Sequence, residues 1–163
     1  MRALGIDCGS EYTGFGVVEQ LSTSELLCVA AGAIHLSKRH PLSVRLLRVC
    51  EELTSIIARY QPEVAAIEDI FYAANVKSAL KLGEVRGVAM MTAAKCGLPV
   101  VGYAPLAVKS AVVGYGRAEK TQVQDMVARL LKLPSPPQPA DAADALAVAI
   151  CHLHTAATLA AQK

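Results

Sequence analysis

The chain has 163 residues, of which 53% are hydrophobic, and its formal net charge is +2. Its length suits one domain, no apolar stretch approaches the roughly 20 residues that cross a bilayer, and the N-terminus lacks the features of a secretory signal. We therefore expect a cytoplasmic protein. The five cysteines are widely spaced, which predicts reduced and mostly buried thiols rather than a zinc site or disulfides.

The first strand is expected over residues 2–7 and ends at Asp7, before a glycine-containing turn. Leu4 and Ile6 favour burial, so the carboxylate needs a partner. Asp7 has two interpretations: it caps the turn by accepting hydrogen bonds from nearby N–H groups, or it binds a divalent cation. Residues 14–19 and 25–36 predict two further strands, which complete an antiparallel meander.

Helices and strands alternate in the middle of the chain. Apolar spacing predicts a helix over residues 41–60, and a short buried strand over residues 63–67 precedes Glu68. This alternation indicates a parallel part of the sheet, where ligands bind beyond the carboxyl ends of the strands. We therefore expect Asp7 and Glu68 to face the same edge of the sheet.

Phe71 lies in a loop before a long helix that is expected over residues 76–96. The aromatic ring is either a hydrophobic anchor beneath a helix or a platform on which an exposed base stacks. The helix carries apolar and small residues over a broad arc, which is typical of deep burial or of contact with a second copy of the chain. A fifth strand, two helices and a proline-rich connection follow at residues 100–103, 105–113, 121–133 and 134–139.

The last helix is expected from Ala140 onward and carries Asp141 and Asp144 on one face of its beginning. The helix dipole alone favours acids there, but Asp144 lies within an otherwise apolar stretch. His152 and His154 are two residues apart and point to different helix faces. We expect both histidines to lie at the surface and not to act as ligands.

Four carboxylates thus stand at the ends of expected elements. Packed together, they would repel and raise one another's pKa, so such a cluster is sustained mainly by cations. Oxygen ligands favour Mg²⁺ or Mn²⁺, and two such ions about 4 Å apart would bridge a phosphodiester, activate a water and stabilise the leaving oxygen. The four residues are Asp7, Glu68, Asp141 and Asp144.

Five segments resemble, in order and spacing, the RuvC family of bacterial Holliday junction resolvases, and together they are highly specific. They are residues 5–16 (GIDCGSEYTGFG), 67–75 (IEDIFYAAN), 78–83 (SALKLG), 118–124 (AEKTQVQ) and 141–146 (DAADAL). The resemblance implies an α/β, ribonuclease H-like fold. Its five-stranded mixed sheet has three antiparallel strands followed by parallel strands, is flanked by helices and forms a single domain of residues 1–163.

The resemblance also implies a homodimer that nicks two symmetric strands of a four-way DNA junction in recombination and repair. The implied cofactor is Mg²⁺, with Mn²⁺ as a substitute and two ions per site, and the implied partners are RuvA and RuvB. The four carboxylates would bind metal and catalyse, and the helix from Val76 would form much of the dimer contact. Contacts with DNA would fall to Phe71, Lys109 and Lys120, and we also expect one from Arg117, in the loop at residues 114–120 that carries two cations.

Two positions depart from the family pattern, because Cys8 replaces a usual proline and Ala74 replaces a common basic residue. Two other interpretations remain. Residues 5–10 also resemble the phosphate-binding turn of the actin, Hsp70 and sugar-kinase superfamily, which needs a second such domain and a second glycine-rich loop. The other is a junction-binding module without catalysis, against which the complete carboxylate set argues, or a nuclease that recognises the 2′-hydroxyl of RNA.

Overall fold

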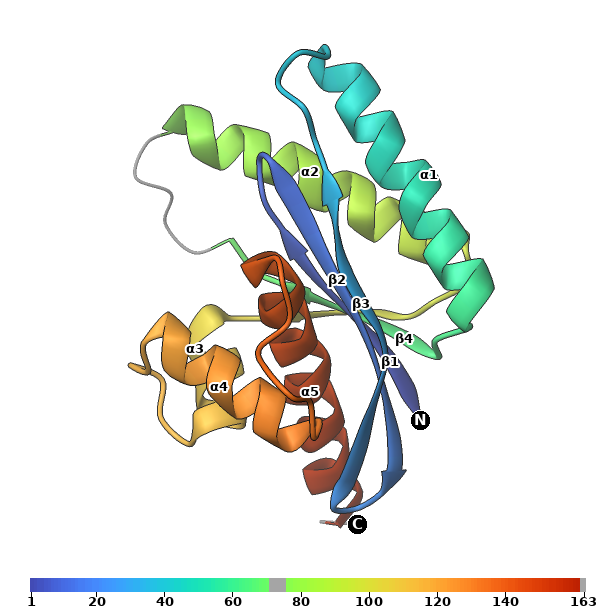
Figure 1. The fold of residues 1–163 in the computed structure, drawn as a ribbon. Helices are drawn as coiled ribbons and strands as arrows, with labels where there is room; N and C mark the ends of the chain where they lie inside the picture. Colours follow the sequence, from blue (N-terminus) through green and yellow to red (C-terminus); the bar gives the residue numbers. More distant parts are fainter. Residues whose placement is uncertain (71–75, 162–163) are drawn as a thin grey trace.

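The computed structural model describes residues 1–70 and 76–161, which form a five-stranded mixed sheet between two layers of helices (Figure 1). The strands are β1 (Arg2–Cys8), β2 (Tyr12–Ser22), β3 (Glu25–His35), β4 (Val64–Glu68) and β5 (Val100–Tyr103). The helices are α1 (Leu42–Tyr60), α2 (Val76–Lys95), α3 (Pro105–Val113), α4 (Lys120–Leu130) and α5 (Ala140–Ala161).

The strands lie in the order β3-β2-β1-β4-β5. β1 pairs with β2 and β2 with β3 in the antiparallel sense, whereas the β1–β4 and β4–β5 pairs are parallel. The predicted meander and the predicted parallel part are both confirmed. Ile6 lies opposite Ile67 in the β1–β4 register, so Asp7 and Glu68 follow at the same edge of the sheet.

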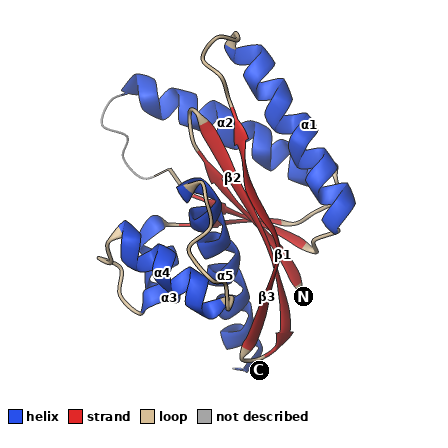
Figure 2. Cartoon of the chain, in the orientation of Figure 1, coloured by secondary structure: helices blue, strands red, loops and turns tan. Residues whose placement is uncertain are grey.

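One layer of helices covers each face of the sheet (Figure 2), and the two layers bury alternate residues of the strands. Leu4 and Ile6 pack beneath α1 and α2, whereas Ala3 packs against α5 and its neighbours α3 and α4. α5 is buried over most of its circumference because it contacts the sheet on one side and α3 and α4 on the other. The sheet therefore separates two hydrophobic cores.

Two glycines allow α5 to lie very close to the sheet. A Cβ on Gly5 would lie 2.0 Å from the carbonyl oxygen of Ala145, and a Cβ on Gly14 would lie 2.0 Å from that of Asp141. Any larger residue at either position would push α5 away from β1 and β2. The close approach brings the acidic beginning of α5 to the end of β1.

α4 begins at Lys120, one residue earlier than predicted. Glu119 and Gln122 form a reciprocal capping box, in which the main-chain N–H of Glu119 donates to Gln122 Oε1 at 2.9 Å. The helix ends at Leu130, before the predicted end, because Lys132 has a left-handed backbone with φ of 53°. Lys120 is therefore the first helical residue.

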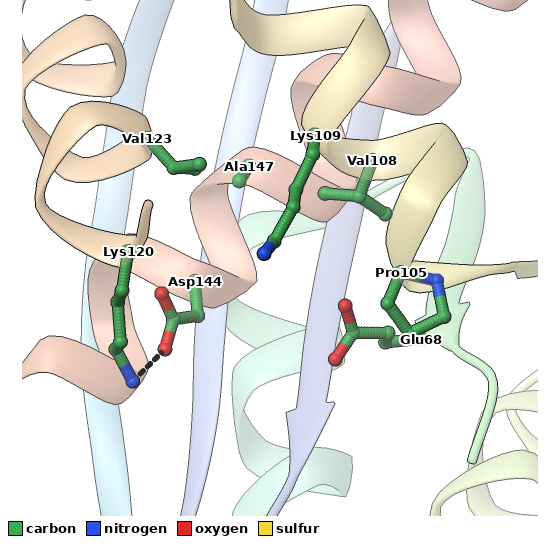
Figure 3. Close-up of a pocket in the computed structure, with 8 residues that line it drawn as sticks. All are labelled: Glu68, Pro105, Val108, Lys109, Lys120, Val123, Asp144 and Ala147. Carbon is green, nitrogen blue, oxygen red and sulfur yellow. Dashed lines mark ion pairs between the residues drawn. The ribbon is translucent and has the colours of Figure 1, made fainter. Parts of the chain in front are cut away.

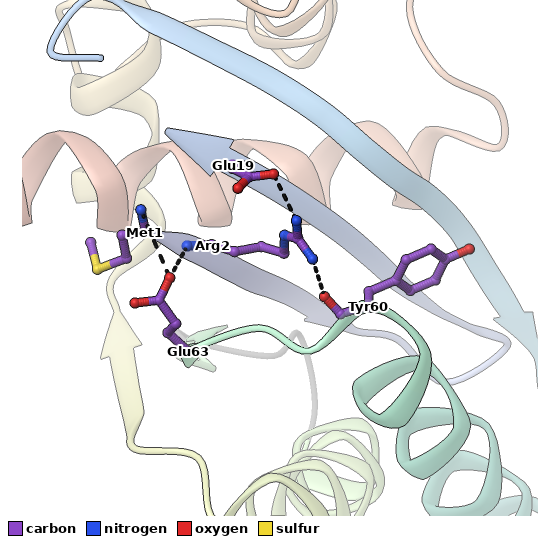
Figure 4. Close-up of polar contacts among 5 residues, drawn as sticks. All are labelled: Met1, Arg2, Glu19, Tyr60 and Glu63. Carbon is purple, nitrogen blue, oxygen red and sulfur yellow. Dashed lines mark hydrogen bonds and ion pairs between the residues drawn. The ribbon is translucent and has the colours of Figure 1, made fainter. Parts of the chain in front are cut away.

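Charged groups are paired at the amino ends of β1 and β4 (Figure 4). Arg2 Nη1 donates to the Tyr60 carbonyl at 2.5 Å, and Arg2 Nη2 lies 2.7 Å from the Glu19 carboxylate. The main-chain N–H of Arg2 donates to Glu63 Oε1 at 2.8 Å, and the ammonium of Met1 lies 3.8 Å from the same oxygen. This network ties β1 to β2, to the end of α1 and to the segment before β4.

The prediction that His152 and His154 lie at the surface is wrong, because both are partly buried. The Tyr103 hydroxyl and His152 Nδ1 form a hydrogen bond of 2.9 Å, and His154 Nδ1 lies 3.1 Å from the Ala111 carbonyl oxygen. Neighbours cover both faces of α5, so a spacing of two residues does not bring either ring out to solvent.

The cysteine prediction is confirmed in part. The five cysteines are free thiols, but only Cys151 is buried and the other four are partly exposed. Two of the latter, Cys8 and Cys28, lie in strands of the sheet. Among the described residues, no helix is long and apolar enough to cross a bilayer.

Candidate active site

The four carboxylates that were predicted to converge do so at one edge of the sheet. Asp7 comes from β1, Glu68 is the last residue of β4, and Asp141 and Asp144 lie at the beginning of α5. Asp144 and Asp141 both raise the pKa of Asp7 beyond the larger effect of burial, so these charges act on one another. Three separate elements thus deliver one acidic cluster.

A pocket of about 260 Å³ opens beside this cluster (Figure 3). Its polar side chains come from β4, α3, α4 and α5, and its walls are otherwise aliphatic. In Figure 3 the carboxylates and ammonium groups point into the same space. The lining residues are Glu68, Pro105, Val108, Lys109, Lys120, Val123, Asp144 and Ala147.

The surroundings of Asp7 and Glu68 oppose their ionisation. Burial, together with the carboxylates of Asp144 and Asp141, raises the pKa of Asp7 to about 6. Burial, together with the neighbouring carboxylates of Asp7 and Asp144, raises the pKa of Glu68 to about 7. A carboxylate that capped the β1–β2 turn would have a lowered pKa, so these shifts favour the cation-binding interpretation of Asp7.

Two lysines bring positive charge to the cluster. Lys120 Nζ lies 2.6 Å from Asp144 Oδ2, and this contact raises the pKa of Lys120. Burial is the main influence on the pKa of Glu68 and raises it, whereas Lys109 lowers it. The ammonium of Lys109 points into the pocket from α3 (Figure 3).

The donor chemistry of the cluster fits a hard divalent cation, because carboxylates offer only oxygen ligands. Burial and the neighbouring carboxylates raise the pKa values of Asp7 and Glu68, although Lys120 lowers the first and Lys109 the second. As the side chains stand, no three Asp, Glu, His or Cys residues within 1–70 and 76–161 are arranged to hold a metal ion. The ligand chemistry of these residues therefore fits a divalent cation, although their present side-chain arrangement does not yet form a site. A cation would compete with Lys120 for Asp144.

The remaining residues singled out in the sequence have different outcomes. Arg117 is exposed in the turn before α4 and is not among the described residues that line the pocket. Phe71 and Ala74 lie outside the described residues. Cys8, in place of the usual proline, continues β1 past Asp7 and pairs with Thr13.

Sequence reasoning missed two arginines that donate to main-chain carbonyls, one after β1 and one at the end of β4. Arg45 of α1 donates a hydrogen bond to the Ser10 carbonyl in the β1–β2 turn. Arg86 of α2 donates a hydrogen bond to the Glu68 carbonyl. The sequence carried a partial signal for Arg86, since this charge follows buried Val85 and precedes an uncharged stretch over residues 87–94.

Comparisons with known sequences agree with this arrangement. The family model "Crossover junction endodeoxyribonuclease RuvC" matches residues 3–152. The chain is 68% identical over 159 residues to the crossover junction endodeoxyribonuclease RuvC of Koribacter versatilis, covering 98% of this chain and 96% of the relative. It is 54% identical over 169 residues to that of Acidobacterium capsulatum, covering 100% and 99%.

A solved structure is similar along nearly the whole chain. Thermus thermophilus RuvC in complex with Holliday junction substrate superposes with a TM-score of 0.92 at 32% identity, covering 97% of this chain and 96% of that one. This similarity, with the observed strand order, confirms the ribonuclease H-like fold. Because the family model spans residues 3–152 and close relatives match almost end to end, the chain belongs to the RuvC family of crossover junction endodeoxyribonucleases.

Proposed function

We propose that this protein resolves four-way (Holliday) DNA junctions by paired, symmetric nicks during recombination and repair. The observation that carries this function is the gathering of four carboxylates and two lysines at one edge of the sheet, beside a pocket that two of the carboxylates and both lysines line. Chains named crossover junction endodeoxyribonucleases share more than half of their residues with it. The similar Thermus thermophilus structure contains a Holliday junction substrate.

The metal and its ligands are the first part of the proposal. Asp7, Glu68, Asp141 and Asp144 hold Mg²⁺, for which Mn²⁺ substitutes, with two ions present during catalysis. Bound there, the ions would supply an activated water and stabilise the leaving oxygen of the cleaved phosphodiester. The raised pKa values of Asp7 and Glu68 support this role, because a nearby cation would lower both pKa values and stabilise the ionised carboxylates.

The contacts with DNA are the second part. Lys109 and Lys120 bind the reacting phosphate, and the phosphate gives Lys120 an alternative to its present partner Asp144. Arg117, in the exposed turn before α4, binds the backbone nearby, and Phe71 contacts bases at the junction centre. Because phosphate contacts release counterions, junction binding should weaken as salt increases.

The third part is a homodimer in which two copies of α2 meet. Leu80 is 64% and Met91 54% exposed, and both lie on one stripe with two glycines. No described atom lies within 4 Å of a Cβ built on Gly83 or Gly87, so a second helix can approach there. A two-fold junction calls for two identical sites, which a symmetric dimer supplies. The exposed stripe comprises Leu80, Gly83, Gly87, Met91 and Ala94.

Gly87→Glu tests this contact without disturbing the monomer. Open space surrounds Gly87 within the chain, so the variant should fold with unchanged helix content. Sedimentation should show monomers in place of dimers, and nicks should become unpaired. Ser55→Glu, on an exposed position of α1, is the matched control. A dimeric Gly87→Glu variant would place the contact elsewhere.

Family membership supports the remaining parts. Residues 1–163 act as one nuclease domain, the protein works with RuvA and RuvB, and it acts in the cytoplasm, where bacterial chromosomes lie. Adding RuvA and RuvB to a junction reaction should change the rate or the position of cleavage. An unchanged reaction would remove this partnership.

Cleavage of a synthetic four-way junction, beside a linear duplex of the same sequence, tests the function. With Mg²⁺, the protein should make paired symmetric nicks that a ligase can seal, in the junction only. A chelator should stop cleavage and leave junction binding intact. Equal cleavage of the duplex, or cleavage of neither substrate across several junction sequences by folded protein with metal, would contradict the proposal.

A further inference from the structure

Arg86 of α2 contacts the end of β4, directly beside Glu68. Its Nε donates a hydrogen bond to the Glu68 carbonyl at 3.2 Å, and its Nη2 lies 2.5 Å from Asp69 Oδ1. Its Nη1 lies 3.1 Å from the Met90 sulfur, one turn further along α2. The Arg86 side chain is only 22% exposed, so the protein itself satisfies the guanidinium.

These contacts hold the point at which β4 leaves the sheet. The β1–β4 pairing ends at Ile67, one residue before Glu68. On the opposite side, the main-chain N–H of Asp69 donates to the Tyr103 carbonyl at 2.8 Å. Because Glu68 stands at this boundary, the direction of its carboxylate depends on what fixes its main chain. A planar guanidinium that bonds two consecutive residues provides such a fixed support.

The neighbouring strand β5 leaves room for this ion pair. A Cβ on Gly102 would lie 2.6 Å from Asp69 Oδ1 and 3.3 Å from Arg86 Nη2. Any side chain at position 102 would therefore displace the pair. α2 also contacts both β4 and β5, so the pair lies where three elements meet.

We propose that Arg86 is a positioning residue for Glu68, which fixes the end of β4 so that the Glu68 carboxylate stays directed at the acidic cluster. This role rests on the proposed function, because it takes Glu68 as a metal ligand. Arg86 acts through the main chain of Glu68 and the side chain of Asp69. α2 thereby joins the metal site on one face to the proposed dimer contact on the other.

Mn²⁺ binding to the DNA-free protein tests this role. Arg86→Gln should weaken Mn²⁺ binding by about 10- to 100-fold, as expected when a group that orients a metal ligand is lost. Arg86→Lys should recover part of the affinity, because it keeps the charge opposite Asp69. Lys95→Gln removes a charge from the exposed last turn of the same helix and should leave the affinity unchanged. Junction binding without metal and the oligomeric state should not change in any of them.

Amide hydrogen exchange separates positioning from a general loss of stability. In metal-free Arg86→Gln, exchange should accelerate at residues 68–70 while the rest of the sheet keeps its protection. Unchanged Mn²⁺ affinity, with exchange raised evenly across the sheet, would make Arg86 a purely structural residue and overturn the proposal. Gly102→Ala displaces the Arg86–Asp69 ion pair without removing a charge. If Arg86→Gln does not fold, the Mn²⁺ affinity and amide exchange of Gly102→Ala test the role of Arg86 instead.

Glu68→Gln separates the failure of this role from the failure of the proposed function. If Glu68→Gln leaves Mn²⁺ binding unchanged, the metal site itself is wrongly assigned. If Glu68→Gln weakens Mn²⁺ binding and Arg86→Gln does not, only the role of Arg86 is wrong.

Discussion

The charged groups at the two ends of β1 and β4 differ: opposite charges pair at the amino ends, whereas carboxylates crowd together at the carboxyl ends. At their amino ends, Arg2 meets the Glu19 carboxylate and the Tyr60 carbonyl, and Glu63 meets two main-chain nitrogens (Figure 4). At their carboxyl ends, like charges gather, and burial and mutual repulsion raise the pKa values of Asp7 and Glu68. The same two strands thus carry paired opposite charges at one end and crowded like charges at the other.

This difference indicates what each end is for. A paired network lowers the energy of the folded chain alone, so the Arg2 network has a structural explanation. Crowded carboxylates raise that energy unless a cation arrives, and such perturbed groups in a pocket are typical of functional sites. At the carboxyl ends of β1 and β4, a bound cation would relieve the repulsion among the carboxylates. Substitutions there should therefore affect cleavage, whereas substitutions at the amino ends should affect stability.

Removing one acid from the crowded end should give the largest effect on cleavage. Asp7→Asn keeps the shape of the side chain but loses the charge that would hold a metal. Junction cleavage should fall by about 1,000-fold or more, which corresponds to the loss of several kcal/mol of transition-state stabilisation. Junction binding in a chelator should persist. Single-turnover cleavage and gel-shift titration measure the two quantities, and normal cleavage would remove Asp7 from the metal site.

Removing the positive charge of Lys120 from the acidic cluster should have a smaller effect on cleavage. Lys120→Gln removes the partner of Asp144. Burial raises the pKa of Asp7, and the variant also removes a positive charge that lowers it. Cleavage should fall by about 100-fold, as for loss of one preorganised group that stabilises developing charge. The pH profile of metal binding should move upward, because Asp7 then ionises at higher pH.

Lys132→Gln is the matched control for Lys120→Gln. Lys132 also pairs with a carboxylate, lying 3.0 Å from Glu25, but it is not among the described residues that line the pocket. This control should keep full activity and an unchanged pH profile. If both lysine variants behave alike, the contact between Lys120 and Asp144 has no special role in cleavage.

At the paired end, substitution should change stability and leave the chemistry intact. Arg2→Ala leaves the Tyr60 carbonyl and Glu19 without their partner, which should cost about 1–3 kcal/mol. The melting temperature should fall by about 3–9 °C, while cleavage per folded molecule stays normal. Arg48→Ala removes an exposed pair 3.9 Å from Glu52 and should cost less than about 0.5 kcal/mol. A loss of cleavage in folded Arg2→Ala would break the distinction between the two ends.

The smallest expected effect is a pH dependence of the metal-free protein. Asp7 and Glu68 have folded-state pKa values of about 6 and about 7, above their ordinary values of 3.8 and 4.5. Between about pH 4 and about pH 7 the folded state therefore binds more protons than the unfolded state, and stability falls as pH rises. Thermal denaturation should give a melting temperature a few degrees higher at about pH 5 than at about pH 8.

Two further measurements check the origin of this pH dependence. Asp7→Asn should flatten it, because one of the two titrating groups is gone. Mg²⁺ should raise the melting temperature more at high pH than at low pH, because protons compete for the same oxygens. A melting temperature of wild-type protein that rises steadily through the window would contradict the assigned pKa directions.

Local sequence patterns predicted where strands and helices lie, but they did not predict which side chains contact one another. The strand ends at Asp7 and Glu68 were visible because an apolar stretch stops at a carboxylate, and the sheet then brings both ends together. The partners of Arg2 and Arg86 were not visible. They depend on how α1 and α2 dock against the sheet, across separations of 17 to 58 residues.

The acidic beginning of α5 shows the same limit. Spacing put Asp141 and Asp144 on one face, but only the close approach of α5 over Gly14 brings them to Asp7. The same burial of α5 explains why His152 was wrongly expected at the surface. Helix periodicity indicates a buried face, whereas the number of covering neighbours comes from the tertiary fold.

Anomalous diffraction from crystals grown with Mn²⁺ at about pH 8, where both raised acids ionise, tests the cation site most directly. We predict a Mn²⁺ peak among Asp7, Glu68, Asp141 and Asp144, with Lys120 no longer 2.6 Å from Asp144. No peak at this edge of the sheet, with the contact between Lys120 and Asp144 intact, would show that the lysines alone neutralise the cluster and that it is not a metal site.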